Sequence, residues 1–286
     1  MASPSTPDAA LAPFPPGELL RLGDDALGVE VAPAAGGRIA RITHAGADWL
    51  VGFDQAPAMI AWGCYPMLPW AGRIRRGRFA FDGRAHVLPA NLGAHAIHGV
   101  GFALPWTLEA HTHKHIELSL RLPEDERWPF GGVARQRIEL DGTALRLQLS
   151  LHAGERAMPR PVLGWHPWFR KPERVEFSPS AMYPRDADGI ATRPTIAPAP
   201  APGPWDDCFL NDQPVVLHRA GQSLRLTSDC DHWVVYDQTA HATCIEPQTG
   251  PPDAFNLDAS VLRAGESGSA WFKAEFSAQG ESGWRD

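Results

Sequence analysis

Hydrophobic and polar residues alternate along several stretches of the chain, the pattern of β-strands with one buried face. The clearest case is Arg137–Leu151, where leucine recurs at every second position on both sides of an Asp141-Gly142 turn. His115–Leu122 alternates in the same way. Nowhere does a helical period persist beyond about two turns. The pattern therefore predicts an all-β chain folded as a sandwich or barrel.

Shorter alternating stretches at intervals of about 8–12 residues, with turn residues between them, predict the remaining strands. We expect a hairpin at Arg78–Pro89. We expect further strands at Ala26–Val31, Gly37–His44, Trp49–Phe53, Arg174–Phe177, Val215–His218, Ser223–Thr227, His232–Tyr236 and Ser269–Phe276. The chain shows no internal repeat and no linker between halves. We therefore expect one domain over residues 20–286, preceded by a flexible Ala/Pro-rich tail at residues 1–19.

Five stretches resist a periodic reading, and all carry ionisable groups next to aromatic residues. They are Cys64–Gly77, Asn91–Gly101, Gly164–Arg170, Trp205–Phe209 and Glu246–Asn256. Most are rich in glycine and proline, so we expect irregular loops, with Glu246 in a rigid turn after an apolar strand end. Loops of this kind hold binding and catalytic residues more often than the strands that they connect.

The ionisable residues of these stretches make up a set suited to proton transfer. They are Arg73, His98, His166, Asp206 with Asp207, and Glu246. Two imidazoles, a carboxylate base and a guanidinium suit acid/base chemistry on a hydroxyl-rich substrate. Taken singly, each residue is more often structural. Their shared position outside the strand pattern favours a common site.

Composition narrows the function classes. A net charge of −7 favours neither nucleic acid nor an anionic membrane surface as a partner. The sequence contains no run of 18 apolar residues, so no membrane span is predicted. Four widely spaced cysteines form no C-x-x-C pair, and the first residues lack a signal-peptide pattern. We therefore expect a cytoplasmic protein with a small-molecule substrate.

Other candidate sites are weaker. His111, His113 and His115 could share one strand face around a metal, but Lys114 lies among them where a hairpin should turn. A solvated strand end explains this segment better, so we expect no metal. The chain has no G-x-G-x-x-G, Walker or G-x-S-x-G motif, which removes the usual support for a nucleotide cofactor or serine hydrolysis.

Taken together, the loop motifs resemble those of the aldose 1-epimerase (galactose mutarotase) family, in order and over about residues 20–280. Y-P-M-L-P-W-A-G-R-I-R-R-G and N-L-G-A-H-A-I-H-G place Arg73 and His98 at family site positions. G-W-H-P-W-F, W-D-D-C-F and C-I-E-P-Q-T-G-P-P-D-A-F-N do the same for His166, Asp206 and Glu246. Two departures are Gly72, where the family has asparagine, and Trp168, where it has tyrosine. The residues of these motifs resemble those of a less characterised bacterial branch of the family.

This resemblance implies a single-domain β-supersandwich of the galactose mutarotase type and a cofactor-free isomerase. It implies Glu246 as base, His166 as acid and His98 as a polarising group. Arg73, Asp206 and Gln248 would bind the sugar, with Trp168 or Trp70 stacking on it. The expected activity is interconversion of the α and β anomers of a free aldohexose, by a monomer or homodimer.

Two alternatives remain open. The first is epimerisation of a hexose 6-phosphate, for which Arg75, Arg76 and Arg78 offer additional cations. The second is a sugar-binding or regulatory protein that kept the fold and lost turnover.

Overall fold

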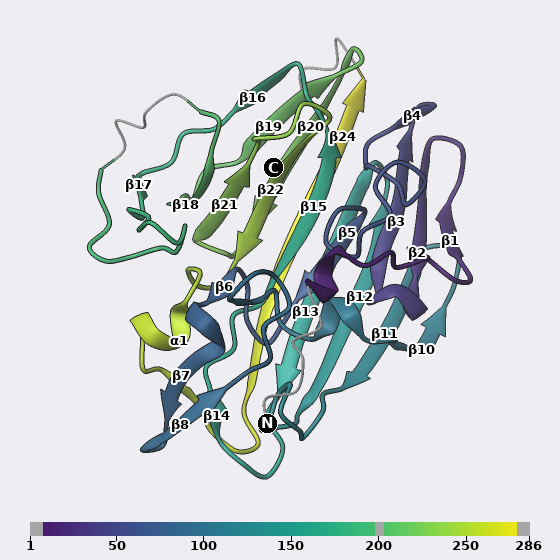
Figure 1. Cartoon of the computed structure of the whole chain (residues 1–286). Helices are drawn as coiled ribbons and strands as arrows, with labels where there is room; N and C mark the ends of the chain where they lie inside the picture. The colour runs from purple at the N-terminus through teal and green to yellow at the C-terminus, as the bar shows by residue number, and fades with distance from the viewer. Residues whose placement is uncertain (1–7, 198–202, 279–286) are drawn as a thin grey trace.

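The computed structural model describes residues 8–197 and 203–278, and most of its strand residues lie in two large sheets (Figure 1). Every ladder between their strands is antiparallel, as the strand pattern and short turns require. The all-β prediction is confirmed.

The larger sheet has ten strands, and several of them carry the motifs that hold the candidate site residues. In the order β1-β2-β3-β5-β15-β22-β21-β18-β17, with β4 paired to β3, they are β1 (Leu20–Gly23), β2 (Leu27–Ala32), β3 (Arg38–His44), β5 (Cys64–Met67), β15 (Gly164–Arg170), β22 (Ala242–Gln248), β21 (His232–Tyr236), β18 (Asp206–Leu210), β17 (Ala181–Met182) and β4 (Ala47–Asp48).

The smaller sheet has eight strands and contains the alternating leucines. In the order β10-β11-β12-β13-β24-β20-β19-β16, they are β10 (Thr107–His111), β11 (His115–Arg121), β12 (Val133–Asp141), β13 (Ala144–His152), β24 (Ser267–Ala278), β20 (Gln222–Ser228), β19 (Val215–Arg219) and β16 (Arg174–Glu176).

Short elements connect the sheets and cover their edges. They are the pairs β6 (Arg73–Ile74) with β9 (Ala96–Ile97), β7 (Arg78–Phe81) with β8 (Arg84–Val87) and β14 (Met158–Pro159) with β23 (Val261–Leu262), the 3-10 turns η1 (Ala9–Leu11), η2 (Pro33–Ala35), η3 (Arg75–Gly77) and η4 (Gly101–Ala103), and the helix α1 (Ala254–Leu257). Among residues 8–197 and 203–278, no helix has the length and apolar character needed to cross a membrane.

One hydrophobic core joins the inner faces of the two sheets. Leu147 and Leu149 of β13 belong to it, as do Trp165 of β15 and Phe272 of β24, whose rings lie 5.9 Å apart. Gln136 of β12 is buried in this core and accepts a hydrogen bond from the Trp165 indole. Burial of alternate side chains from both sheets stabilises the sandwich, at about 25 cal/mol per Å² of apolar surface.

Several strand predictions are confirmed, for the smaller sheet and for the separate pair β7 and β8. β11, β12 and β13 occupy the alternating stretches, and β12 and β13 extend beyond the predicted ends. β7 and β8 form the expected hairpin through Asp82 and Gly83, both with positive φ, as a type I′ turn requires. The expected strand at Trp49–Phe53 is wrong, since that segment forms only an isolated bridge at Leu50.

The expectation of loops was wrong for all or part of four motif segments. β5, β15 and β22 are strands in the middle of the larger sheet, and Glu246 lies within β22 instead of in the turn that follows. Asp206 likewise begins β18. These strands are buried on both faces, so the hydrophobic alternation that marks a half-buried strand is absent.

Part of the expected N-terminal tail, residues 8–14, is bonded to the rest of the domain. Ala10 donates a backbone hydrogen bond to Asn91, and Phe14 donates one to Pro57. Residues 8–14 are therefore part of the domain, because these bonds tie them to two other segments. Residues 1–7 of the expected tail lie outside the described residues.

Candidate active site

The central strands of the larger sheet place a row of side chains on its outer face. In the register of β15 with β22, Gly164 faces Gln248 and Trp168 faces Cys244, which sets His166 opposite Glu246. Tyr65 of β5 is the partner of His166 on the other side. Because alternate residues of a strand share a face, Trp165 and Ile245 point into the core instead.

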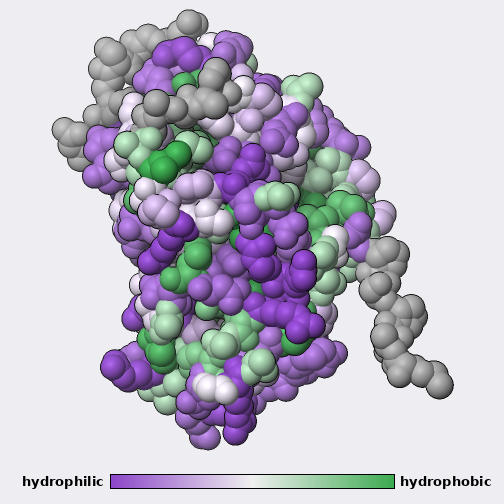
Figure 2. Space-filling model, turned by 60° about the vertical axis from the view of Figure 1, so that its left-hand side comes forward, coloured by the Kyte–Doolittle hydropathy of each residue, from purple (hydrophilic) through white to green (hydrophobic). Residues whose placement is uncertain are grey.

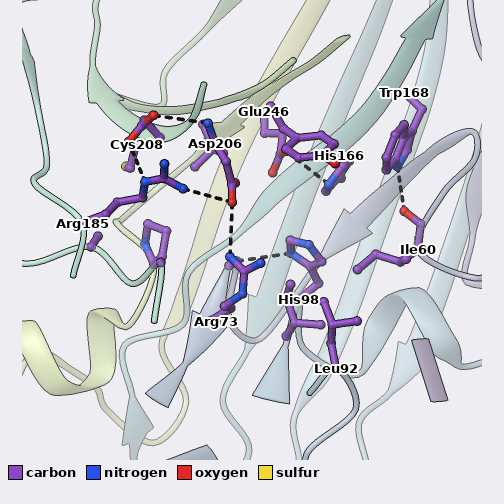
Figure 3. Close-up of a pocket in the computed structure, with 18 of the residues that line it drawn as sticks. Ile60, Arg73, Leu92, His98, His166, Trp168, Arg185, Asp206, Cys208 and Glu246 are labelled. Atoms are coloured by element: carbon purple, nitrogen blue, oxygen red, sulfur yellow. Dashed lines mark hydrogen bonds and ion pairs between the residues drawn. The ribbon is translucent and has the colours of Figure 1, made fainter. Parts of the chain in front are cut away.

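Glu246 and His166 form the centre of this row (Figure 3). Glu246 Oε1 lies 3.2 Å from His166 Nε2, and the two side chains are only 3% and 6% exposed. Tyr65 and Trp168 stack on the imidazole from two sides, with ring centroids at 4.8 and 5.4 Å. His166 Nδ1 is buried without a partner among the described residues, so Nε2 is the nitrogen that faces both Glu246 and the pocket.

Burial shifts the proton affinities of this pair. Desolvation, reinforced by Asp206, raises the pKa of Glu246 well above its usual value, although Arg73 opposes the shift. Desolvation also lowers the pKa of His166 to about 3. Both shifts disfavour the charged forms. The pair therefore holds one proton over a wide pH range, and the short contact allows that proton to lie on either partner.

His98 approaches the pair from the turn after β9. Its ring lies at 86° to that of His166, with centroids 4.9 Å apart. The Gly72 backbone N–H donates to His98 Nδ1 at 3.2 Å, so Nε2 carries the proton of the neutral ring. Burial, together with His166 and Arg73, lowers the pKa of His98 well below its usual value. His98 is therefore a neutral hydrogen-bond donor.

Gly72 explains one departure from the family motif. Its φ is +65°, and a Cβ at this position would lie 2.6 Å from Cβ of Pro252. An asparagine cannot fit here without moving Pro252, which lines the pocket. The close approach of the two backbones therefore requires glycine.

Two arginines and two aspartates form the polar side of the pocket (Figure 3). Arg73 Nη1 lies 3.7 Å from Asp206 Oδ2, and Arg185 Nη1 lies 3.3 Å from the same oxygen. Arg185 Nε also pairs with Asp207 Oδ1 at 2.8 Å. Desolvation raises the pKa of Asp206, although both arginines oppose this. The two positive charges are thus balanced by two carboxylates.

Apolar side chains form the opposite side. They are Leu11, Ile60, Leu92, Ile97 and Trp168. The Trp168 indole N–H donates to the Ile60 carbonyl at 2.7 Å, which fixes the ring at the pocket wall. The cavity between the polar and apolar sides measures about 200 Å³. Such a pocket suits a small molecule with hydroxyls on its edge and an apolar face.

Six of the eight predicted site residues line this one pocket. They are Arg73, His98, His166, Trp168, Asp206 and Glu246. Trp70 does not, because its indole is buried in the core and donates to the Ala96 carbonyl. Gln248 shares the outer face with Glu246 but is buried and donates to the Gly250 carbonyl. These two residues support the pocket wall without lining it.

Arg185 and Leu11 line the pocket and were missed by the sequence reasoning, which singled out Asp207 only beside Asp206. Leu11 lies in the segment expected as a tail. Arg185 lies in an irregular stretch with no motif, and only the density of charges in Arg185–Asp188 could have indicated it.

One group of potential metal ligands gathers within the described ranges, at His166, Cys244 and Glu246, whose ligand atoms lie within 4.8 Å of one another. Burial raises the pKa of the Cys244 thiol well above its usual value, as it does for Glu246. A metal binds thiolate and carboxylate anions. The surroundings thus favour the protonated form of two of the three ligands, which suits proton exchange better than metal binding.

The segment His111–His115 lies at the β10–β11 turn. Thr112 accepts a hydrogen bond from the Lys114 backbone there, and His111 contacts the Arg21 carbonyl. The segment is mostly exposed. It is the solvated strand end that the sequence predicted.

Comparison with known proteins connects the chain with a family. The family model described as aldose 1-epimerase matches residues 18–275. A curated relative, the uncharacterized protein YphB of Escherichia coli K12, is 32% identical over 109 residues. That match covers 37% of this chain and 36% of the relative.

Solved structures share the fold. A galactose mutarotase-like protein from Clostridium acetobutylicum has a TM-score of 0.79 at 17% identity, covering 91% of this chain and 95% of that protein. The GalM/aldose epimerase homologue from C. elegans has a TM-score of 0.78 at 17% identity, covering 92% and 99%. A galactose 1-epimerase from Lactobacillus acidophilus NCFM has a TM-score of 0.75 at 17% identity, covering 91% and 95%. The fold is thus of the galactose mutarotase type, and the chain belongs to the aldose 1-epimerase family.

Proposed function

We propose that this protein is an aldose 1-epimerase that interconverts the α and β anomers of a free aldohexose. The observation that carries the proposal is the buried contact of 3.2 Å between Glu246 and His166 in a pocket with polar and apolar sides. Mutarotation requires an acid and a base that act on adjacent oxygens and then exchange roles. A pair that shares one proton meets this requirement.

In the proposed mechanism, the Glu246 carboxylate takes the proton of the C1 hydroxyl while protonated His166 Nε2 gives a proton to the ring oxygen. The bond between C1 and the ring oxygen breaks and leaves the open aldehyde. After rotation about C1–C2, the ring hydroxyl returns its proton to His166 and attacks the other face of C1. Glu246 then returns its proton to O1, so the proton count of the enzyme is unchanged.

The reactive form places the shared proton on His166, and burial alone disfavours that form. Substrate binding would favour it, because a hydroxyl donor and the cation of Arg73 stabilise the Glu246 carboxylate. His98 Nε2–H would hydrogen-bond the reacting oxygens. Arg73 and Asp206 would hold ring hydroxyls, and Trp168 would pack against the apolar face of the sugar. A positioned acid or base contributes about 10²–10⁴-fold to the rate.

Charge balance favours a free sugar over a hexose 6-phosphate. Arg73 and Arg185 are both paired with aspartates within the pocket. Arg75, one of the cations considered for a phosphate, contacts Asp186, Asp188 and Asp253 instead. A phosphate dianion would have to compete with these carboxylates, at the cost of its own hydration.

Exchange NMR on equilibrated sugars tests the proposal. We expect catalysed exchange between α and β anomers for at least one of glucose, galactose and mannose, with kcat/KM at least tenfold above that for glucose 6-phosphate. Calorimetric binding of these sugars without any catalysed exchange would instead support a non-catalytic sugar-binding protein and refute the mechanism.

A further inference from the structure

Arg185 lies on the segment between β17 and β18, which also contributes Gly189 and Ala191 to the pocket. We propose that Arg185 is a specificity-determining residue that binds, together with Asp206, a sugar hydroxyl remote from C1. This inference rests on the function proposed above and extends it to a residue outside the sequence motifs.

The contacts of Arg185 point to hydroxyl recognition. Its guanidinium pairs with Asp207 at 2.8 Å and with Asp206 at 3.3 Å, and its side chain remains 30% exposed at the pocket. Five N–H donors are more than these two pairs use. Asp206 offers acceptor oxygens beside those donors. A hydroxyl can donate to one group and accept from the other at the same time, which a single charged group does not allow.

The position of Arg185 indicates which end of the sugar it meets. In Figure 3, Asp206 and Arg73 lie between Arg185 and the pair Glu246 and His166. The proton-transferring pair must act at C1 and the ring oxygen. A sugar held there reaches Arg185 with the hydroxyls farther along its ring.

The segment is anchored from outside the pocket, which holds Arg185 in place. Arg75 of η3 forms ion pairs with Asp186 and with Asp188, the latter at 3.2 Å. An isolated bridge joins Arg185 to Ala191. Because the backbone is fixed, less side-chain and loop entropy is lost when Arg185 binds a ligand. Arg75 does not line the pocket, so Arg75→Ala is a matched control that loosens the same segment without removing a side chain from the pocket.

A panel of mono-deoxy sugars tests the inference. Anomer exchange of the best aldohexose and of its 2-, 3-, 4- and 6-deoxy forms is measured by NMR with the unaltered protein, Arg185→Ala, Arg185→Lys and Arg75→Ala. For the unaltered protein, we expect one deoxy form to lose about 10- to 100-fold in kcat/KM, because it leaves charged groups unpaired.

In Arg185→Ala we expect the parent sugar to lose a similar factor, mainly through KM, and the penalty for that deoxy form to shrink below threefold. Arg185→Lys, which keeps the positive charge, should restore part of the loss in kcat/KM that this deoxy form shows with the unaltered protein. Arg75→Ala, which only loosens the segment, should lower the rates of all sugars by one common factor. Thermal unfolding of each variant confirms that it is folded.

The inference is overturned if Arg185→Ala retains the full penalty for every deoxy form, since Arg185 would then act on structure alone. It is also overturned if the parent sugar keeps its kcat/KM in Arg185→Ala. If the unaltered protein exchanges no sugar, the proposed function fails, and calorimetric binding of the same panel to the same variants then decides the role of Arg185.

Discussion

The two sheets bury their residues in different ways, and this difference locates the site. In the smaller sheet, β12 and β13 alternate between buried residues, mostly apolar, and more exposed polar residues. In the larger sheet, β15 and β22 are buried on both faces. Their outer face, which carries Glu246 and His166, is covered by segments such as Asp8–Leu11 and Arg185–Ala191. The candidate catalytic residues therefore occupy positions that would be exposed to water in the smaller sheet.

Covering this face changes the chemistry of its side chains. Exposed carboxylates of the smaller sheet, such as Glu117 and Glu139, pair with Arg137. Such surface pairs contribute about 0–1 kcal/mol to stability. Among the described residues, no lysine or arginine lies within salt-bridge distance of Glu246, which contacts His166 instead, and burial raises the pKa of Glu246. Tuned proton affinity is what acid/base catalysis requires.

On the face drawn in Figure 2, the hydrophobic residues of the surface lie in separate groups between hydrophilic ones.

The largest expected effect separates two buried histidines. His166→Asn removes the proposed acid, so kcat should fall by about 10²–10⁴-fold in an anomer-exchange assay. His44→Asn is the matched control, because His44 is equally buried but binds Gln222 away from the pocket. We expect it to lose stability and to keep kcat within about threefold. Equal losses of kcat in both variants would show that burial, not proton transfer, explains the effect.

A substitution in the core of the smaller sheet should lower stability and leave kcat unchanged, in contrast to His166→Asn. Leu149 is fully buried in the shared core, so Leu149→Ala should lower the free energy of unfolding by about 2–5 kcal/mol, as measured by urea titration. The folded variant should retain its kcat at a temperature well below its Tm. A loss of kcat that exceeds the unfolded fraction would mean that the two sheets do not separate stability from activity.

The pH dependence of stability should differ between Glu246 and a neutral substitute. The folded pKa of Glu246 is raised, so above pH 4.5 the unfolded chain releases a proton that the folded chain retains. The stabilising contribution is therefore lost as pH rises. Glu246→Gln removes this loss, so the Tm of the variant minus that of the unaltered protein should grow as the pH rises above 4.5. A difference in Tm that is constant or that shrinks with pH would contradict the raised pKa.

The two buried histidines of the site, His98 and His166, change the stability with pH in the opposite sense to Glu246. His166 has a pKa of about 3 in the folded protein, so below pH 6.5 the unfolded chain binds a proton that the folded chain does not. Stability should therefore fall as pH decreases from 6.5. Glu246→Gln should retain this acid limb, which distinguishes the contribution of the histidines from that of the carboxylate.

The smallest expected effect concerns the pocket wall. Trp168→Phe keeps an aromatic face and removes the hydrogen bond to the Ile60 carbonyl. One such bond contributes about 0.5–1.5 kcal/mol, so KM should rise about 2- to 10-fold while kcat changes little. Steady-state kinetics on the best sugar checks this. An unchanged KM would show that the indole does not contact the substrate.

The sequence predicted the smaller sheet well because half-buried strands alternate visibly. It also singled out His98, His166 and Glu246, through motifs and resemblance, and the structure brings these three residues together in one pocket. It mistook β5, β15 and β22 for loops, because burial on both faces removes the alternation and because Pro167 and Pro247 suggested irregular backbone. The role of Arg185 depends on how Arg185–Ala191 folds over the pocket. A contact between segments far apart in the sequence leaves no pattern within either segment.

Polarimetry on freshly dissolved α-glucose and α-galactose tests the central claim most directly. It compares the unaltered protein with Glu246→Gln and with Glu117→Gln, a carboxylate on the exposed face of the smaller sheet. We expect Glu246→Gln to lose at least 10²-fold in catalysed mutarotation while remaining folded, and Glu117→Gln to match the unaltered protein. A Glu246→Gln rate close to that of the unaltered protein would contradict the assignment of this residue as the base.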